Sequence, residues 1–131
     1  MASYIVILVD TDILIGHLRG LAVARDWLIA ARREGPLAIS VVSIAEIVGG
    51  MRSGERREAW RLLASLRAEP VTEIAARRAG ELQRRYRRSH SGIGLGDYLI
   101  AATADVKGYR VATLNVRHFP MFENLRPPFQ L

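Results

Sequence analysis

Residues 4–12 of the chain read YIVILVDTD, an apolar run that stops at two aspartates. Tyr4–Val9 is rich in Ile and Val and shows no alternation of apolar and polar residues. This is typical of a strand buried on both faces, as in a parallel sheet. Asp10 and Asp12 follow directly, where either can cap a following helix. The stretch therefore predicts a buried first strand with carboxylates at its end.

Helical and extended patterns alternate through the rest of the chain. Further strands are expected at Leu37–Ser40, briefly at Val71, over Tyr109–Leu114 and at the edge of the sheet in the tail after Phe119. Helices are expected before Gly35, from Ser43 to Met51, and over Glu55–Arg67, Glu73–Arg88 and Asp97–Val106. Strands that alternate with helices predict an α/β domain with a central, mainly parallel sheet, and the length fits one domain over residues 1–131.

The composition narrows the function classes. The net charge is +6, and the basic residues are eighteen arginines and Lys107. An arginine-rich surface suits nucleic acid, although a compositional bias with solvated helix faces gives the same numbers. There is no cysteine, which excludes disulfides and thiolate chemistry. No apolar run reaches the roughly 20 residues that span a bilayer, and no signal peptide is evident, so we expect a cytoplasmic protein without a membrane partner.

Four polar side chains are expected at one edge of the sheet. Asp10 ends the first strand, Glu46 lies in the first turn of the helix after the second strand, Asp97 opens a buried helix, and Asn115 follows the last strong strand. In open α/β sheets, functional groups collect at the carboxyl ends of the strands.

Each acid also has a purely structural interpretation. Asp10 can be an N-cap, Ser43 and Glu46 spell a capping box, and Asp97 can interact with its helix dipole. Such interpretations do not explain why the acids share one edge. Clustered carboxylates repel one another, and a hard cation such as Mg²⁺ or Mn²⁺ removes that conflict while polarising a phosphodiester.

Four segments together carry a family resemblance. They are Ile7–Ile15 (ILVDTDILI), Ser40–Gly50 (SVVSIAEIVGG), Ile93–Ala104 (IGLGDYLIAATA) and Arg110–Phe119 (RVATLNVRHF). In this order they resemble PIN-domain ribonucleases, specifically the VapC-type toxins of toxin–antitoxin pairs, over essentially the whole chain. The resemblance implies a three-layer α/β/α domain.

The resemblance also implies roles for individual residues. The acids aligned with Asp10, Glu46 and Asp97 bind Mg²⁺ or Mn²⁺ in that family and are needed for cleavage. Asn115 stands where a fourth acid is common, which leaves one charge fewer and makes one well-held metal the expectation. Residues expected to support the site are Asp12, Ser43 and Thr113. The implied reaction is hydrolysis of an RNA phosphodiester by an activated water, which leaves a 5′-phosphate.

The implied partners are RNA, a cognate VapB-like antitoxin and a second copy of the chain. The antitoxin is expected on exposed apolar residues of the helices over Ile44–Leu66, for which a place in the core is the alternative. Candidate RNA contacts are Arg84, Arg85, Arg88 and Arg117, for which a solvated helix end is the alternative. None of the three histidines has metal-ligand spacing. His118 lies near Asn115 and is interpreted as a surface residue, with contact to RNA as the alternative.

Three other functions stay open on the sequence. A phospho-receiver domain needs a lysine near the last strand, but Lys107 precedes that strand at a helix end. A PIN-like RNA-binding or scaffold module without catalysis is favoured only by Asn115. A PIN nuclease of RNA processing, outside any toxin pair, has the same sequence features as a toxin.

Overall fold

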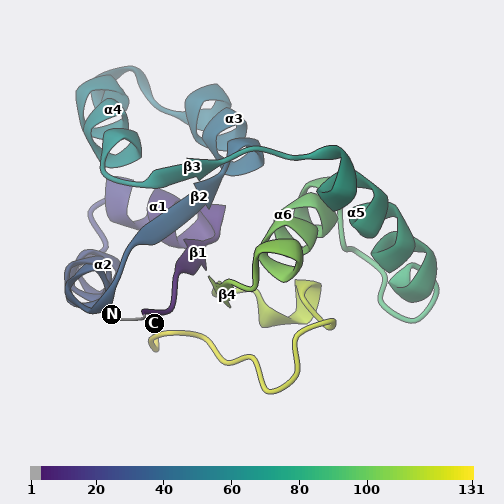
Figure 1. Ribbon diagram of the computed structural model, residues 1–131. Coiled ribbons are helices and arrows are strands. Elements are labelled where there is room, and N and C mark those ends of the chain that lie inside the picture. The colour runs from purple at the N-terminus through teal and green to yellow at the C-terminus, as the bar shows by residue number, and fades with distance from the viewer. Residues whose placement is uncertain (1–3) are drawn as a thin grey trace.

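The computed structural model describes residues 4–131 and contains one four-stranded sheet (Figure 1). The strands are β1 (Ile7–Val9), β2 (Leu37–Ser40), β3 (Arg67–Glu69) and β4 (Arg110–Ala112). The helices are α1 (Thr11–Leu18), α2 (Ala22–Glu34), α3 (Val41–Gly50), α4 (Arg56–Ala64), α5 (Glu73–Tyr86) and α6 (Leu95–Lys107), with 3₁₀ turns η1 (Ser53–Glu55) and η2 (Val116–His118). The strand order is β3-β2-β1-β4, and every pairing is parallel, which confirms the predicted α/β fold.

Both faces of the sheet are covered, so the molecule has three layers. Leu8 of β1 faces a core built with α5 and α6, whereas Val9 faces a second core built with α1 to α4. Figure 1 shows these two groups of helices on opposite sides of the sheet. This double burial is why β1 and β2 are apolar without alternation.

Two predicted strands are wrong. The third strand is β3 rather than Val71; its first two residues are exposed and only Glu69 is buried, so it carries no apolar pattern. In the tail from Phe119 to Leu131, all of which the structure describes, no strand forms. The tail contains three prolines, which cannot donate a ladder hydrogen bond.

The start of α3 also differs from its prediction. The helix begins at Val41 because Ser40 is its N-cap, with Ser40 Oγ accepting from Val42 N at 3.0 Å. Ser43 is therefore a buried residue inside the helix, and the capping-box interpretation of Ser43 and Glu46 is wrong. Glu46 accordingly lies in the second turn rather than the first.

Helix α6 begins two residues before its predicted start. Gly94 is the N-cap, so Asp97 lies within the first turn, and its carboxylate accepts from Gly94 N at 3.3 Å. The helix ends at Lys107, one residue after its predicted end, and its C-cap Gly108 has a left-handed φ of 71°. Within residues 4–131, no helix has the length and apolar content to cross a membrane.

Candidate active site

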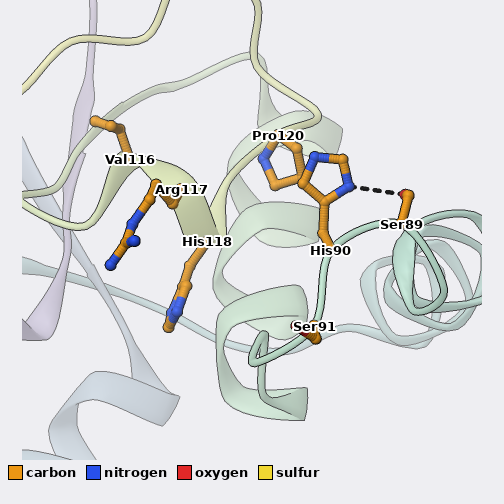
Figure 2. A pocket seen from close by; sticks show the side chains of 7 residues that line it. All are labelled: Ser89, His90, Ser91, Val116, Arg117, His118 and Pro120. Atoms are coloured by element: carbon orange, nitrogen blue, oxygen red, sulfur yellow. Dashed lines mark hydrogen bonds between the residues drawn. The ribbon is translucent and has the colours of Figure 1, made fainter.

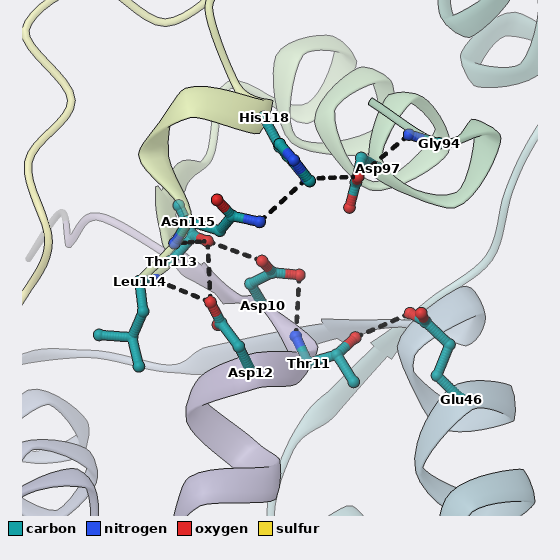
Figure 3. Close-up of polar contacts among 10 residues, drawn as sticks. All are labelled: Asp10, Thr11, Asp12, Glu46, Gly94, Asp97, Thr113, Leu114, Asn115 and His118. Carbon is teal, nitrogen blue, oxygen red and sulfur yellow. Dashed lines mark hydrogen bonds and ion pairs between the residues drawn. The ribbon is translucent and has the colours of Figure 1, made fainter. Parts of the chain in front are cut away.

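The predicted acids lie together at the carboxyl edge of the sheet because the strands are parallel and the helices that carry Glu46 and Asp97 begin at this edge. Asp10 and Thr113 directly follow the parallel neighbours β1 and β4. Helix α6 leads into β4, so it runs antiparallel to the strands and its first turn, with Asp97, lies at that same edge (Figure 3). Glu46 reaches the edge from α3, which follows β2.

Asp10 is the most buried of the acids, with 6% of its surface exposed. Its Oδ1 accepts from Thr11 N at 2.8 Å, as the N-cap of α1, and its Oδ2 accepts from the Thr113 hydroxyl at 2.7 Å. Burial, and then the negative charge of Asp12, raise the pKa of Asp10 to about 6 despite these hydrogen bonds, with a smaller contribution from Asp97. The N-cap interpretation is therefore correct but incomplete, because capping alone leaves a costly buried charge.

Asp12 has a different role in the site. Its Oδ1 accepts from Ile13 N at 2.8 Å and its Oδ2 from Leu114 N at 2.9 Å. Both oxygens are thus engaged with backbone, and they tie the start of α1 to the segment after β4. Burial raises the pKa of Asp12 as well. This geometry suits the supporting role expected for Asp12.

Glu46 is held by two hydroxyls. Thr11 Oγ1 lies 2.8 Å from both Glu46 Oε1 and Ser43 Oγ. A hydroxyl has one proton and a carboxylate can only accept, so Thr11 donates to Glu46 and Ser43 donates to Thr11. Ser43 is fully buried whereas Glu46 is exposed. The arrangement fixes one carboxylate oxygen of Glu46 and leaves Oε2 available.

Asp97 is held by His118. Nδ1 of His118 lies 3.0 Å from Asp97 Oδ2 and 2.9 Å from Asn115 Nδ2. A carboxylate can only accept, so the contact with Asp97 requires a proton on Nδ1; without that proton, Nδ1 accepts from the Asn115 amide instead. His118 therefore has two alternative partners, and the choice between them is coupled to the position of Asp97.

These side chains surround one open pocket of about 240 Å³. It is lined by Asp10, Thr11, Asp12, Ile15, Glu46, Asp97 and Asn115. Within residues 4–131, no group of three or more Asp, Glu or His side chains is arranged so that it could hold a metal ion. The pocket presents separated carboxylates, of which Asp10 and Glu46 accept hydrogen bonds from the hydroxyls of Thr113 and Thr11.

A second, polar cleft of about 480 Å³ adjoins this pocket through His118 (Figure 2). Arg117 lines it, from the 3₁₀ turn η2. The other predicted RNA contacts are Arg84, Arg85 and Arg88, which are exposed at the C-terminal end of α5 and just after it. None of them lines the pocket or the cleft.

Sequence reasoning missed two members of the site, Thr11 and His118. Thr11 stands between two acids at the start of a helix, and a buried hydroxyl there needs a partner. His118 lies three residues after Asn115 in a 3₁₀ turn, which folds its ring back toward the carboxyl edge. His118 is partly exposed, as expected for a surface residue, but the sequence did not indicate that its ring also contacts Asp97.

Comparisons with known proteins agree with this geometry. The family model described as PIN domain matches residues 7–121. Ribonuclease VapC10 of Mycobacterium tuberculosis is 72% identical over 94% of this chain and 92% of its own length. Ribonuclease VapC19 of the same species is 43% identical over 93% and 98%. A toxin–antitoxin complex from Klebsiella pneumoniae contains a chain with a TM-score of 0.78 and 25% identity, over 95% of this chain and 98% of that one.

Proposed function

This chain belongs to the PIN-domain family, and from that premise we propose that it is a VapC-type ribonuclease toxin restrained by a VapB-like antitoxin. One observation carries the proposal: Asp10, Glu46 and Asp97 come from three different elements and line one pocket at the carboxyl edge of the sheet. A scaffold module would have no need to keep a buried aspartate with a raised pKa in an open pocket.

The residues present fit a hard divalent cation. Mg²⁺ binds through one or two carboxylates and keeps several waters, so it does not need a closed protein cage. Asp10 and Asp97 are the ligands we propose. The hydrogen bonds of Asp97 from Gly94 N and His118 both fall on Oδ2, so its Oδ1 is available to the pocket. Both oxygens of Asp10 are held, by Thr11 N and Thr113, but each has a second lone pair with which it can bind a cation. A bound Mg²⁺ or Mn²⁺ would supply charge neutralisation and Lewis-acid polarisation of the scissile phosphate.

The other side chains position the reactants. Thr113 donates to Asp10 and accepts from Asn115 N at 3.0 Å, so it fixes the acid and the amide relative to each other. Glu46 keeps Oε2 at the pocket, where it can accept a proton from the attacking water. Asn115 adds no charge, so the amide can bond to water or to a phosphate oxygen without repelling either.

Partners follow from the same premise. The toxin–antitoxin assembly named for the Klebsiella pneumoniae structure supports a protein antitoxin as partner. RNA as the substrate is supported by the ribonuclease relatives and by the positive net charge. A homodimer is proposed from the family resemblance alone.

The test is an RNA cleavage assay with Mn²⁺ or Mg²⁺, with and without a chelator. Asp10→Asn and Asp97→Asn are each expected to lower cleavage on the order of 100-fold or more. Asp26→Asn is the matched control, since this carboxylate is exposed on α2 and lies outside the pocket. The proposal fails if wild type cuts no RNA, or if the two pocket variants cut as fast as the control. Activity that survives chelation refutes the proposed metal dependence.

A further inference from the structure

The cleft beside the carboxylate pocket has the chemistry of a binding site for an anion. Its lining is Ser89, His90, Ser91, Val116, Arg117, His118 and Pro120. The set combines one guanidinium, two imidazoles and two hydroxyls, and it includes no carboxylate. The neighbouring pocket, in contrast, is lined by four acids. The two cavities therefore differ in charge, and His118, which lines the cleft, contacts Asp97 and Asn115 of the acidic pocket.

His118 joins the two cavities physically. Its Nδ1 contacts Asp97 and Asn115 on the acidic side. Its Nε2 faces the loop after α5, where a Cβ added to Gly92 would lie 4.0 Å from it. An RNA strand that lies across the His118 ring would therefore pass directly from the acidic pocket into the cleft.

Arg117 is free to bind a phosphate. It is exposed on η2, and among the described residues it makes no ion pair, unlike Arg19 and Arg78, which are paired with acids. A guanidinium binds phosphate oxygens through two parallel N–H donors, and an unpaired one does so without first breaking a bond.

His90 supplies a fixed ring on the other segment of the cleft. Its Nδ1 lies 2.8 Å from Ser89 Oγ, and its ring meets Tyr86 edge-on with a centroid distance of 5.5 Å. Figure 2 shows this hydrogen bond and places His90 and Ser89 on the turn after α5, apart from the turn that carries Arg117. An exposed ring held in this way can stack on a base without a large loss of side-chain entropy.

We propose that this cleft is an RNA subsite, which holds the nucleotide next to the scissile phosphate with Arg117 on its phosphate and His90 against its base. The subsite rests on the proposed ribonuclease function, because its location matters only if the acidic pocket takes the scissile phosphate. The two cavities then divide the work: the acids and a cation take the reacting phosphate, and the cleft sets the register of the strand.

Binding is measured separately from cleavage, by fluorescence anisotropy of the full chain with a short labelled single-stranded RNA in EDTA. Arg117→Ala is expected to raise the Kd roughly tenfold. It is also expected to reduce the slope of log Kd against log salt by about 0.7, the contribution of one phosphate contact on a single strand. Arg117→Lys keeps the charge and is expected to keep the slope.

The matched control is Arg33→Ala, which removes the same charge from the end of α2. That end leads into β2 and therefore lies at the opposite edge of the sheet. We expect the Kd of this control to change less than about twofold. His90→Ala is expected to raise the Kd about fivefold or more, and His90→Phe, which keeps a flat ring, to restore most of the affinity.

The outcomes separate this inference from the proposed function. If wild type binds and cleaves RNA but Arg117→Ala matches Arg33→Ala in Kd and salt slope, the subsite is refuted and the nuclease stands. If binding depends on Arg117 and His90 but wild type cuts nothing with Mn²⁺ or Mg²⁺, the cleft stands as an RNA-binding site, whereas the nuclease and the position of the cleft beside a scissile phosphate are refuted. If wild type neither binds RNA in EDTA nor cleaves it with Mn²⁺ or Mg²⁺, both are refuted.

Discussion

Asp10→Asn is expected to make the metal-free protein more stable at pH 7 while it removes cleavage. The raised pKa of Asp10 means that its charge is less favourable in the folded chain than in the unfolded one. The difference between the ordinary 3.8 and about 6 corresponds to about 3 kcal/mol. Asparagine has nearly the same shape and no charge, so it keeps the side chain but removes this cost.

The hydrogen bonds of Asp10 can be rebuilt around an amide. Its carbonyl oxygen can still accept from Thr11 N, and its NH₂ can donate to Thr113 Oγ1. The Thr113 hydroxyl can then donate to Asp12 Oδ2, which already lies 3.4 Å away. Because this rearrangement is imperfect, we expect a net gain in the free energy of unfolding of about 1–3 kcal/mol at pH 7.

The pH dependence provides an independent check of the sign. The folded chain holds the proton of Asp10 up to about pH 6, whereas the unfolded chain releases it near 3.8. The wild type is therefore at no disadvantage below the lower value, and it loses stability as pH rises through about 6. Burial raises the pKa of Asp12 too, so that group acts in the same direction. The advantage of Asp10→Asn should shrink as pH falls from 7 to 4.

The assay is denaturant unfolding in EDTA at several pH values, with Asp26→Asn as control. The exposed control is expected to change stability by no more than about 0.5 kcal/mol. Added Mg²⁺ should stabilise wild type more than Asp10→Asn, because a ligand of the folded state adds to its stability. The reasoning is refuted if Asp10→Asn is no more stable than wild type at pH 7, or if its advantage does not fall with pH.

Two further predictions concern the supporting hydroxyls and the backbone. Thr113→Val removes the donor to Asp10 and should lower kcat about 10- to 100-fold; Thr103→Val, whose hydroxyl bonds only within α6, should leave kcat unchanged, and equal rates for the two would contradict the role of Thr113. Gly108→Ala should cost about 1–2 kcal/mol because its φ of 71° is left-handed. Gly80→Ala, inside α5 with open space around it, should instead add about 0.5–1 kcal/mol, and thermal unfolding that shows the same sign for both would contradict this.

The sheet and part of the site could be predicted because they follow from local pattern. A continuous apolar run indicates a strand buried on both faces, and β1 is such a strand. Once the sheet is parallel, residues that follow its strands share an edge, which places Asp10 beside Thr113 and Asn115. Strand β3 escaped prediction because its pairing with β2, rather than its own side chains, makes it a strand.

The supporting contacts could not be predicted because their partners are distant in sequence. Thr11 is 35 residues from Glu46, and Asp97 is 21 residues from His118. No periodicity links such pairs; they meet because separate elements end at one edge. The polar cleft has the same origin, since its two sides come from the turn after α5 and from η2.

The supporting contacts also explain how the edge can hold separated acids without collapsing. Asp10 is fixed by Thr113, Glu46 by Thr11 and Asp97 by His118. Thr11 and Thr113 are neutral donors, so they orient Glu46 and Asp10 without cancelling their charge, which remains available to a cation. An arginine in either place would stabilise the metal-free fold more and compete with the ion. The lower stability predicted for wild type relative to Asp10→Asn at pH 7 therefore follows from carboxylates that are held in position before the proposed cation binds.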